Sequence, residues 1–229
     1  MPKPRKNQIC LDATPFYHCV SRCVRHAFLC GTDPVTGRSF EHRRQRIQDD
    51  SYRLASIFFI EIAAIAVLSN HYHLVVHVDQ QAAISADPLE IAKRWHQIFG
   101  GSELSQRFIN GDPIEHHERG SLDTLIDLWR GRLFSISWFM RVLNEGTARH
   151  ANREDEGTGR FWEGRYKCQA LLDKQALLSC MAYVDLNPVR AGIADTPEHS
   201  DHTSIQTRVN HWKSKANTCL LYTSDAADE

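Results

Sequence analysis

The sequence Ser69-Asn70-His71-Tyr72-His73-Leu74-Val75-Val76-His77-Val78-Asp79 reads as a turn followed by a β-strand with two different faces. Side chains alternate along a strand, so His71, His73 and His77 share one face with Val75. The other face is apolar and carries Tyr72, Leu74, Val76 and Val78. Two histidines at positions i and i+2 of a strand can point at one divalent ion, and neutral imidazole is a common metal ligand. A single strand histidine is more often structural, so it is the pair that favours a metal site.

The residues before this strand predict how it is paired. Residues 60–68 read as a second strand, joined to the histidine strand by a turn at Ser69-Asn70. A helix is predicted over 41–59, where apolar residues recur at helical spacing, and a first strand over 14–22. The chain therefore opens with strand, helix, strand and strand.

The residues after the histidine strand predict mainly helices. They give a helix over 88–99, a polar and irregular segment over 100–120, one long helix over 122–150, a polar loop over 152–159, and a fourth strand over 167–172. Asp173 is a good N-cap for a last helix. That helix is expected to end near Leu186 or Asn187, because Pro188 disfavours helical geometry in the residue before it.

Composition limits the class of protein. A chain of 229 residues with 42% hydrophobic content is typical of a globular fold. It has no apolar run of about 18 residues, and no apolar segment follows its basic start, so we expect a cytoplasmic protein with no membrane partner. Seven cysteines without a regular spacing predict reduced thiols. The spacing of Cys19, Cys23 and Cys30 does not match that of common zinc sites.

The formal net charge of −1 gives no direct sign of a nucleic-acid partner. Residues 219–229 resemble the translation of a sequencing adaptor, and we expect them to be non-native. They hold three acidic and no basic residues, so without them the charge becomes +2. Only seven of the 27 basic residues are lysines. An excess of arginine favours bidentate recognition of phosphate.

The segment Arg160-Phe161-Trp162-Glu163-Gly164-Arg165-Tyr166-Lys167 interleaves aromatic and basic residues. This pattern suits stacked bases and phosphates, although each aromatic residue is equally consistent with the core. The candidate DNA-binding residues are Arg149, Arg160, Trp162, Arg165, Tyr166, Lys167 and Arg190.

Two motifs together resemble a known family. Asn70-His71-Tyr72-His73 and the later Tyr183-Val184-Asp185-Leu186-Asn187-Pro188-Val189-Arg190-Ala191-Gly192 resemble single-tyrosine HUH transposases, and most closely REP-associated tyrosine transposases. The resemblance runs from Thr14 to Ile193. It implies an α+β fold of HUH endonuclease type, with a ferredoxin-like (RRM-like) antiparallel sheet and packed helices.

The resemblance also implies roles for site residues. His71 and His73 would bind a divalent metal, Mg²⁺ or Mn²⁺, and Tyr183 would be the nucleophile. Asn187 lies one helical turn beyond Tyr183 and would complete the metal site, where better-known relatives commonly have Gln. His77 is interpreted as flanking. Asp185 is a candidate for proton handling, or else a solvated acid at the helix end.

The implied activity is that of a metal-dependent transposase that cleaves and rejoins single-stranded, hairpin-associated DNA through a 5′-phosphotyrosine. A tyrosine is a weak nucleophile at neutral pH because its ordinary pKa is near 10, so a metal that polarises the phosphate is expected. No glycine-rich phosphate loop is present, so no nucleotide cofactor is expected. The partner would be single-stranded or hairpin DNA, and the protein either a monomer or a homodimer.

The predicted domain covers residues 1–195, with an extension over 196–218 before the tail at 219–229. Two other functions remain open at this stage. The chain could be an inactive or domesticated relative that binds DNA hairpins, or an RRM-like RNA-binding module whose histidines and aromatics stack bases.

Overall fold

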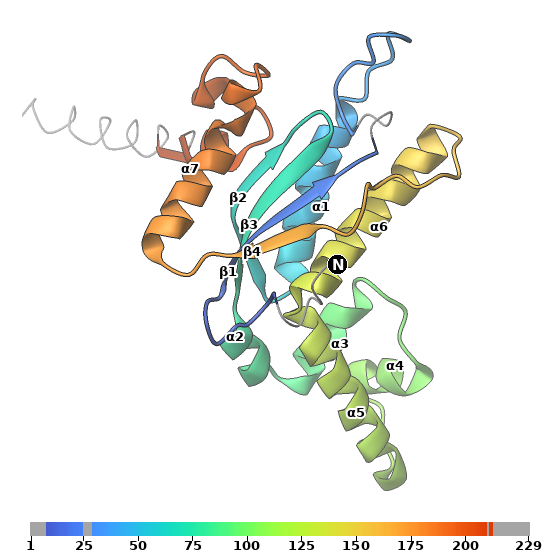
Figure 1. Ribbon diagram of the computed structural model, residues 1–229. Helices are drawn as coiled ribbons and strands as arrows, with labels where there is room; N and C mark the ends of the chain where they lie inside the picture. Colours follow the sequence, from blue (N-terminus) through green and yellow to red (C-terminus); the bar gives the residue numbers. More distant parts are fainter. Residues whose placement is uncertain (1–7, 25–28, 210, 213–229) are drawn as a thin grey trace, which may run out of the picture.

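A four-stranded antiparallel sheet lies at the centre of the computed structural model, which describes residues 8–24, 29–209 and 211–212 (Figure 1). Its strands are β1 (Phe16–Arg22), β2 (Ile60–Val67), β3 (His71–Val78) and β4 (Lys167–Ala170), in the order β2-β3-β1-β4. All neighbours pair antiparallel. This order, with a helix between β1 and β2 and further helices between β3 and β4, is ferredoxin-like. The predicted α+β class is therefore confirmed.

Helices cover both faces of the sheet. They are α1 (His42–Ile57), α2 (Gln80–Ser85), α3 (Pro88–His96), α4 (Glu103–Asn110), α5 (His116–Leu133), α6 (Ile136–Glu154), α7 (Lys174–Arg190) and the short 3₁₀ helix η2 (Pro197–His199). Figure 1 shows α1 and α6 on one face, α7 on the other, and α2 to α5 gathered at one end of the sheet.

The two faces of β3 differ as the alternation predicts. Tyr72 and Leu74 are fully buried in the larger core, which includes residues of α1 and α6. On the opposite face, Val75 is 0% exposed and belongs to a smaller cluster with Val184 of α7. The histidine face is therefore also covered by a helix, α7. This coverage is possible because apolar residues of α7, such as Val184, pack against Val75 of β3.

Two predictions for the middle of the chain are wrong. The segment 100–120 is not irregular, because it contains α4 and the start of α5. Ser102 caps α4 by accepting a hydrogen bond from the Ser105 backbone N–H. The predicted helix over 122–150 is two helices, α5 and α6, with a break between Leu133 and Ile136. At the break, the Leu133 carbonyl accepts a hydrogen bond of 2.9 Å from the Phe59 N–H, which ties the helix end to the start of β2.

The last helix does not end before Pro188, as predicted, but continues to Arg190. A helical proline removes one backbone hydrogen bond, yet the Asn187 carbonyl still accepts the Ala191 N–H at 2.9 Å. Gly192, with φ +67°, follows the helix end. Asn187 therefore stays helical and keeps its position one turn beyond Tyr183.

Residues 196–209 lie against the sheet and α7. The Ser204 hydroxyl accepts a hydrogen bond of 3.0 Å from the Ile65 N–H of β2, and Thr203 forms a β-bridge with Ala66. The segment predicted as an extension thus contacts the predicted domain, and the predicted tail 219–229 lies outside the described residues. Within the described ranges, none of the helices combines the length and apolarity needed to cross a bilayer.

Candidate active site

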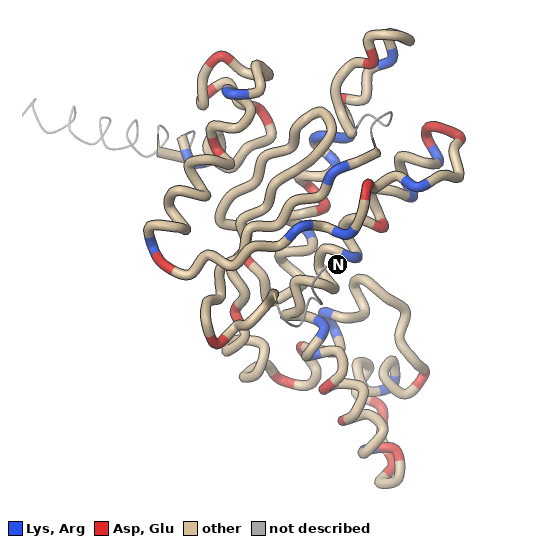
Figure 2. The backbone as a smooth tube through the Cα atoms, in the orientation of Figure 1, with Lys and Arg blue, Asp and Glu red and all other residues tan. Residues whose placement is uncertain are grey.

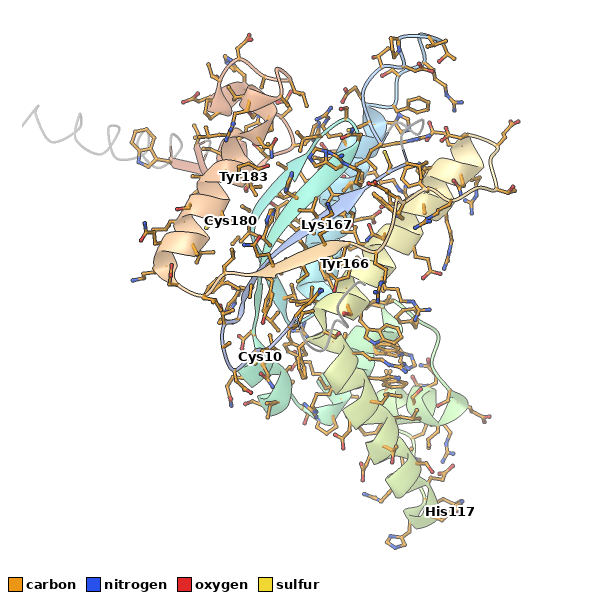
Figure 3. All side chains as sticks on the ribbon, viewed as in Figure 1. Cys10, His117, Tyr166, Lys167, Cys180 and Tyr183 are labelled. Atoms are coloured by element: carbon orange, nitrogen blue, oxygen red, sulfur yellow. The ribbon has the colours of Figure 1, made fainter. Side chains whose placement is uncertain are left out.

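A polar pocket of about 450 Å³ opens where β1, β3, β4 and α7 meet. Its lining residues are His18, Val20, Arg22, His71, His73, Glu163, Gly164, Arg165, Lys167 and Tyr183. Figure 3 marks Tyr183 on α7 and Lys167 at the start of β4, the two elements that flank the pocket. The structure thus brings together two of the predicted metal ligands, the predicted nucleophile and two of the predicted DNA-binding residues.

In both His71 and His73 of β3, the ring nitrogen Nδ1 contacts a neighbouring side chain. The Nδ1 of His71 lies 2.6 Å from Oδ1 of Asn70, so this nitrogen carries the proton and the Nε2 lone pair is free. The Nδ1 of His73 lies 2.9 Å from Nε2 of His18. If His73 donates here, its Nε2 is unprotonated and offers a lone pair, which faces the Asn187 amide at 3.2 Å. Such partners usually fix the tautomer of a metal-ligating histidine.

Helix α7 brings Tyr183 and Asn187 to the same place. The Tyr183 ring lies 5.6 Å from the His73 ring, centroid to centroid. The side-chain amide of Asn187 lies 3.2 Å from Nε2 of His73. Because amide oxygen and nitrogen can exchange places by a rotation about χ2, the Asn187 oxygen can face the point toward which His73 Nε2 is directed.

Burial keeps the imidazoles of the pocket neutral. It lowers the pKa of His73 from 6.5 to about 3, assisted by the neighbouring His18, His71 and Arg22, and His73 is 4% exposed. Burial also lowers the pKa of His18 and, together with Arg22, that of His71. Neutral imidazole is the form that binds a metal, so two histidines and an amide oxygen suit a divalent ion.

Basic side chains surround this cluster. The pocket is lined by Arg22 at the end of β1, by Lys167 at the start of β4 and by Arg165 in the loop before β4, together with one acid, Glu163. Figure 2 shows the basic residues of these two strands close together. The guanidinium of Arg190 lies 5.9 Å from the Tyr183 ring centroid. Such an arrangement can bind a phosphate next to the Tyr183 hydroxyl.

The other predicted DNA-binding residues lie outside this pocket. Arg149 is exposed on α6 and pairs with Glu145 at 2.5 Å. Arg160 donates hydrogen bonds to the carbonyls of Trp162 and Glu163, which stabilises the loop before β4.

Trp162 and Tyr166, the two predicted DNA-binding aromatic residues, contact α6. Trp162 is half-buried and donates its indole N–H to the Asn144 carbonyl at 2.8 Å. Tyr166 is buried, and its hydroxyl lies 3.1 Å from that of Ser137. They line a neighbouring groove of about 590 Å³ along α6. Arg165 and Gly164 line both this groove and the pocket.

Two further residues singled out in the sequence have structural partners. His77 shares the face of His71 and His73 but lies 3.3 Å from Glu61 and packs on Phe16. Asp185 is not a solvated helix-end acid, because it is 5% exposed and binds Ser204 and Arg208. It points away from the pocket lining and anchors α7 to the C-terminal segment.

The sequence did not reveal His18 and Arg22 as site residues. Both lie on β1, and their contribution depends on the pairing of Val20 with His73 and of Arg22 with His71. His18 is a residue type that commonly occurs in metal sites, and the sequence therefore offered it as a candidate by type alone. Its place beside His73 follows only from the register of β1 against β3.

Among the described residues, one group of His and Glu side chains has ligand atoms close enough to hold a metal ion. It consists of His42, His150 and Glu154, all within 4.8 Å of one another. It belongs to α1 and α6, on the opposite face of the sheet from α7, and is therefore distinct from the predicted set.

The sequence matches no family model and no curated protein. The fold, however, is similar to the solved structure of a REP-associated tyrosine transposase bound to a REP hairpin, with a TM-score of 0.53 and 12% sequence identity. The match covers 92% of this chain and 86% of the other. At this identity the likeness concerns the fold, and the predicted HUH transposase-like fold is confirmed.

Proposed function

We propose that this chain is a single-tyrosine HUH transposase that cleaves and rejoins single-stranded, hairpin-associated DNA. One observation carries the proposal: Tyr183 and Asn187, one turn apart on α7, both lie against His73 of β3. The nucleophile and the third ligand thus come from one helix, and the histidine pair from one strand. The transposase similar in fold is itself bound to a REP hairpin, which supports DNA as the partner.

His71, His73 and Asn187 would hold a divalent ion, Mg²⁺ or Mn²⁺. When bound, this ion supplies Lewis-acid stabilisation of charge on the scissile phosphate. His18 and Asn70 would keep the two imidazoles in the tautomer that leaves Nε2 free. Arg22, Arg165 and Lys167 would bind phosphates on either side of the scissile bond.

Tyr183 would be the residue that attacks the scissile phosphate. Its hydroxyl oxygen attacks the phosphorus and gives up its proton to solvent, a Tyr–O–P bond forms, and the P–O3′ bond breaks. The 3′ oxygen leaves and takes up a proton, which gives a free 3′-OH. The downstream strand stays on Tyr183 as a 5′-phosphotyrosine, so the bond energy is kept for rejoining when a 3′-OH attacks in reverse.

An RNA-binding module of the RRM type is a weaker interpretation. RRM domains bind RNA on an open sheet face with exposed aromatic residues. Here α7 covers that face, and the residues under it include Ala64 and Val75, both 0% exposed. The pocket with His71, His73 and Tyr183 lies on this face.

Cleavage of a doubly labelled oligonucleotide tests the proposal. A hairpin with a single-stranded 5′ extension, labelled differently at its 5′ and 3′ ends, is incubated with the protein and Mn²⁺. We expect the 3′ label in an SDS-resistant protein band and the 5′ label in a shorter free strand. Chelator, or the substitution His71→Ala, should abolish both products. Binding without either product would favour the inactive relative, and release of both labels as free strands would exclude the tyrosine mechanism.

A further inference from the structure

A second cluster of metal-ligating side chains lies where the start of α1 meets the end of α6. His42 is the first residue of α1, and His150 and Glu154 are four residues apart near the end of α6. Residues at this spacing share one helix face, so both side chains point toward α1. The ligand atoms of all three side chains lie within 4.8 Å of one another.

We propose that His42, His150 and Glu154 form a second divalent metal site, selective for Zn²⁺-like ions, that joins α1 to α6. Two imidazoles and one carboxylate are a donor set that Zn²⁺ accepts, with a fourth position open to water. Mg²⁺ prefers oxygen ligands and keeps several waters, so it fits this set poorly. The site is separate from the Tyr183 pocket and needs no DNA.

The carboxylate of the cluster is fixed before any ion binds. The Arg43 side chain, 2% exposed, donates from Nε to Oε2 of Glu154 at 2.7 Å. It also donates to Asp155 at 2.5 Å. The other oxygen of Glu154, Oε1, is turned toward His42 and lies 3.0 Å from its Nε2. A hydrogen bond to one carboxylate oxygen is the usual way in which a neighbouring residue orients a metal-ligating carboxylate.

The arginines near Glu154 disfavour ions that bind mainly by electrostatic attraction. Arg43 offsets the carboxylates that it binds, and Arg38 lies 3.7 Å from Oε1 of Glu154. Arg46, on the same helix as His42, pairs with Asp50. A hard cation would thus gain little electrostatic attraction here. An ion that forms directional bonds to imidazole nitrogen is bound much better.

The metal-free state is the His42–Glu154 pair described above, and the ion would replace this contact with three coordinate bonds. Because the ligands come from two helices, the bound ion cross-links the first turn of α1 to the last turn of α6. An ion that binds only the folded chain raises the melting temperature in proportion to the logarithm of its concentration.

Zinc titration of the full chain tests this inference. Chelator-stripped protein is titrated with Zn²⁺ against a chromophoric chelator, with and without excess Mg²⁺. We expect two bound equivalents for the wild type, one of them in the Tyr183 pocket. His150→Ala should lose one equivalent, or weaken it at least tenfold, and His71→Ala/His73→Ala should retain it. The matched control is His117→Ala, an exposed α5 histidine that is labelled in Figure 3 and pairs only weakly with Glu115.

Thermal melting provides the second readout. Zn²⁺ should raise the melting temperature of the wild type and of His71→Ala/His73→Ala, and should not do so for His150→Ala. If His150→Ala fails to fold, His42→Ala, at a half-exposed helix start, serves in its place. Unchanged zinc binding in His150→Ala and His42→Ala, or equal competition by Mg²⁺, would overturn the proposal and leave only the contact between His42 and Glu154.

Discussion

His73 is the residue on which the site depends, because both nitrogens of its ring have a neighbour. Nδ1 faces His18 at 2.9 Å, and Nε2 faces the amide of Asn187 at 3.2 Å. The ring is nearly buried, so its orientation is fixed by these contacts and not by solvent. The orientation of the His73 imidazole is thus set by contacts with β1 and with α7.

The substitution His18→Ala tests the role of this neighbour. Removing a residue that orients a metal-ligating histidine typically weakens metal affinity by about 10- to 100-fold. We expect a loss of this size for Mn²⁺, measured by calorimetry, with the fold retained. His77→Ala is the matched control, because His77 lies on the same face of β3 but pairs with Glu61. Equal effects of the two substitutions would argue against a specific role for His18.

The lowered pKa of His73 predicts an acid-sensitive fold. Its pKa falls from 6.5 to about 3 on folding, because the ring is buried. Between these pH values the unfolded chain binds more protons, so the free energy of unfolding decreases as pH falls below 6.5 and is unaffected above it. The decrease is up to about 1.4 kcal/mol per pH unit.

Urea unfolding of chelator-treated protein between pH 7 and pH 5 measures this effect. The substitution His73→Asn should give a shallower pH dependence than the wild type. If the two curves run parallel, the protonation of His73 does not contribute to acid unfolding.

At the scale of elements, α7 is the helix that assembles the site, and Asp185 anchors it. The buried carboxylate of Asp185 accepts a hydrogen bond from Ser204 at 2.9 Å and pairs with Arg208. Arg208 also donates to the Ala63 carbonyl of β2 at 3.0 Å. The C-terminal segment therefore connects α7 to the sheet on the side opposite the pocket.

The substitution Arg208→Ala should affect the site at a distance. It leaves the Asp185 carboxylate buried with one partner fewer, which costs about 1–3 kcal/mol. We expect lower stability in urea and a lower yield of DNA adduct, although no pocket residue is changed. Arg208→Lys should restore part of both. An unchanged adduct yield in the Ala variant would show that this segment does not position α7.

The sequence predicted correctly those features that depend only on residues close together in the chain. The alternation of β3, its turn at Ser69-Asn70, and the Tyr183–Asn187 spacing all follow from a few adjacent residues. The break between α5 and α6 could not be predicted, because it depends on a hydrogen bond between Leu133 and Phe59. Nor could the burial of His73, since it depends on α7 folding back over the sheet.

The charge of the whole molecule is nearly balanced, but its distribution is not. The formal net charge is −1, yet Arg22, Arg165 and Lys167 converge on one pocket with a single acid. Outside the pocket, most described arginines of α1 and α6 pair with acids of the same or neighbouring helices, such as Arg149 with Glu145. Local charge, and not net charge, is therefore what favours a nucleic-acid partner.

Salt dependence of DNA binding measures how many of these cations contact phosphate. For a single strand, the slope of log K against log salt changes by about 0.7 for each phosphate that is neutralised. We expect Arg165→Ala to reduce the slope by about this amount, and Lys167→Ala likewise. Arg149→Ala should leave it unchanged, because that residue lies outside the pocket. An equal reduction for Arg149 would show that the strand runs along α6 instead.

The central claim is that Tyr183 forms the covalent bond to DNA, and mapping of the adduct tests it most directly. The wild type, Tyr183→Phe and Tyr166→Phe are incubated with hairpin DNA and Mn²⁺, digested with protease and nuclease, and analysed by mass spectrometry. Tyr183 is 43% exposed, so loss of its hydroxyl costs at most about 1 kcal/mol of stability. We predict a nucleotide on the peptide that contains Tyr183 in the wild type and in Tyr166→Phe, and none in Tyr183→Phe. An adduct that persists in Tyr183→Phe, or that maps to Tyr166, would contradict the claim.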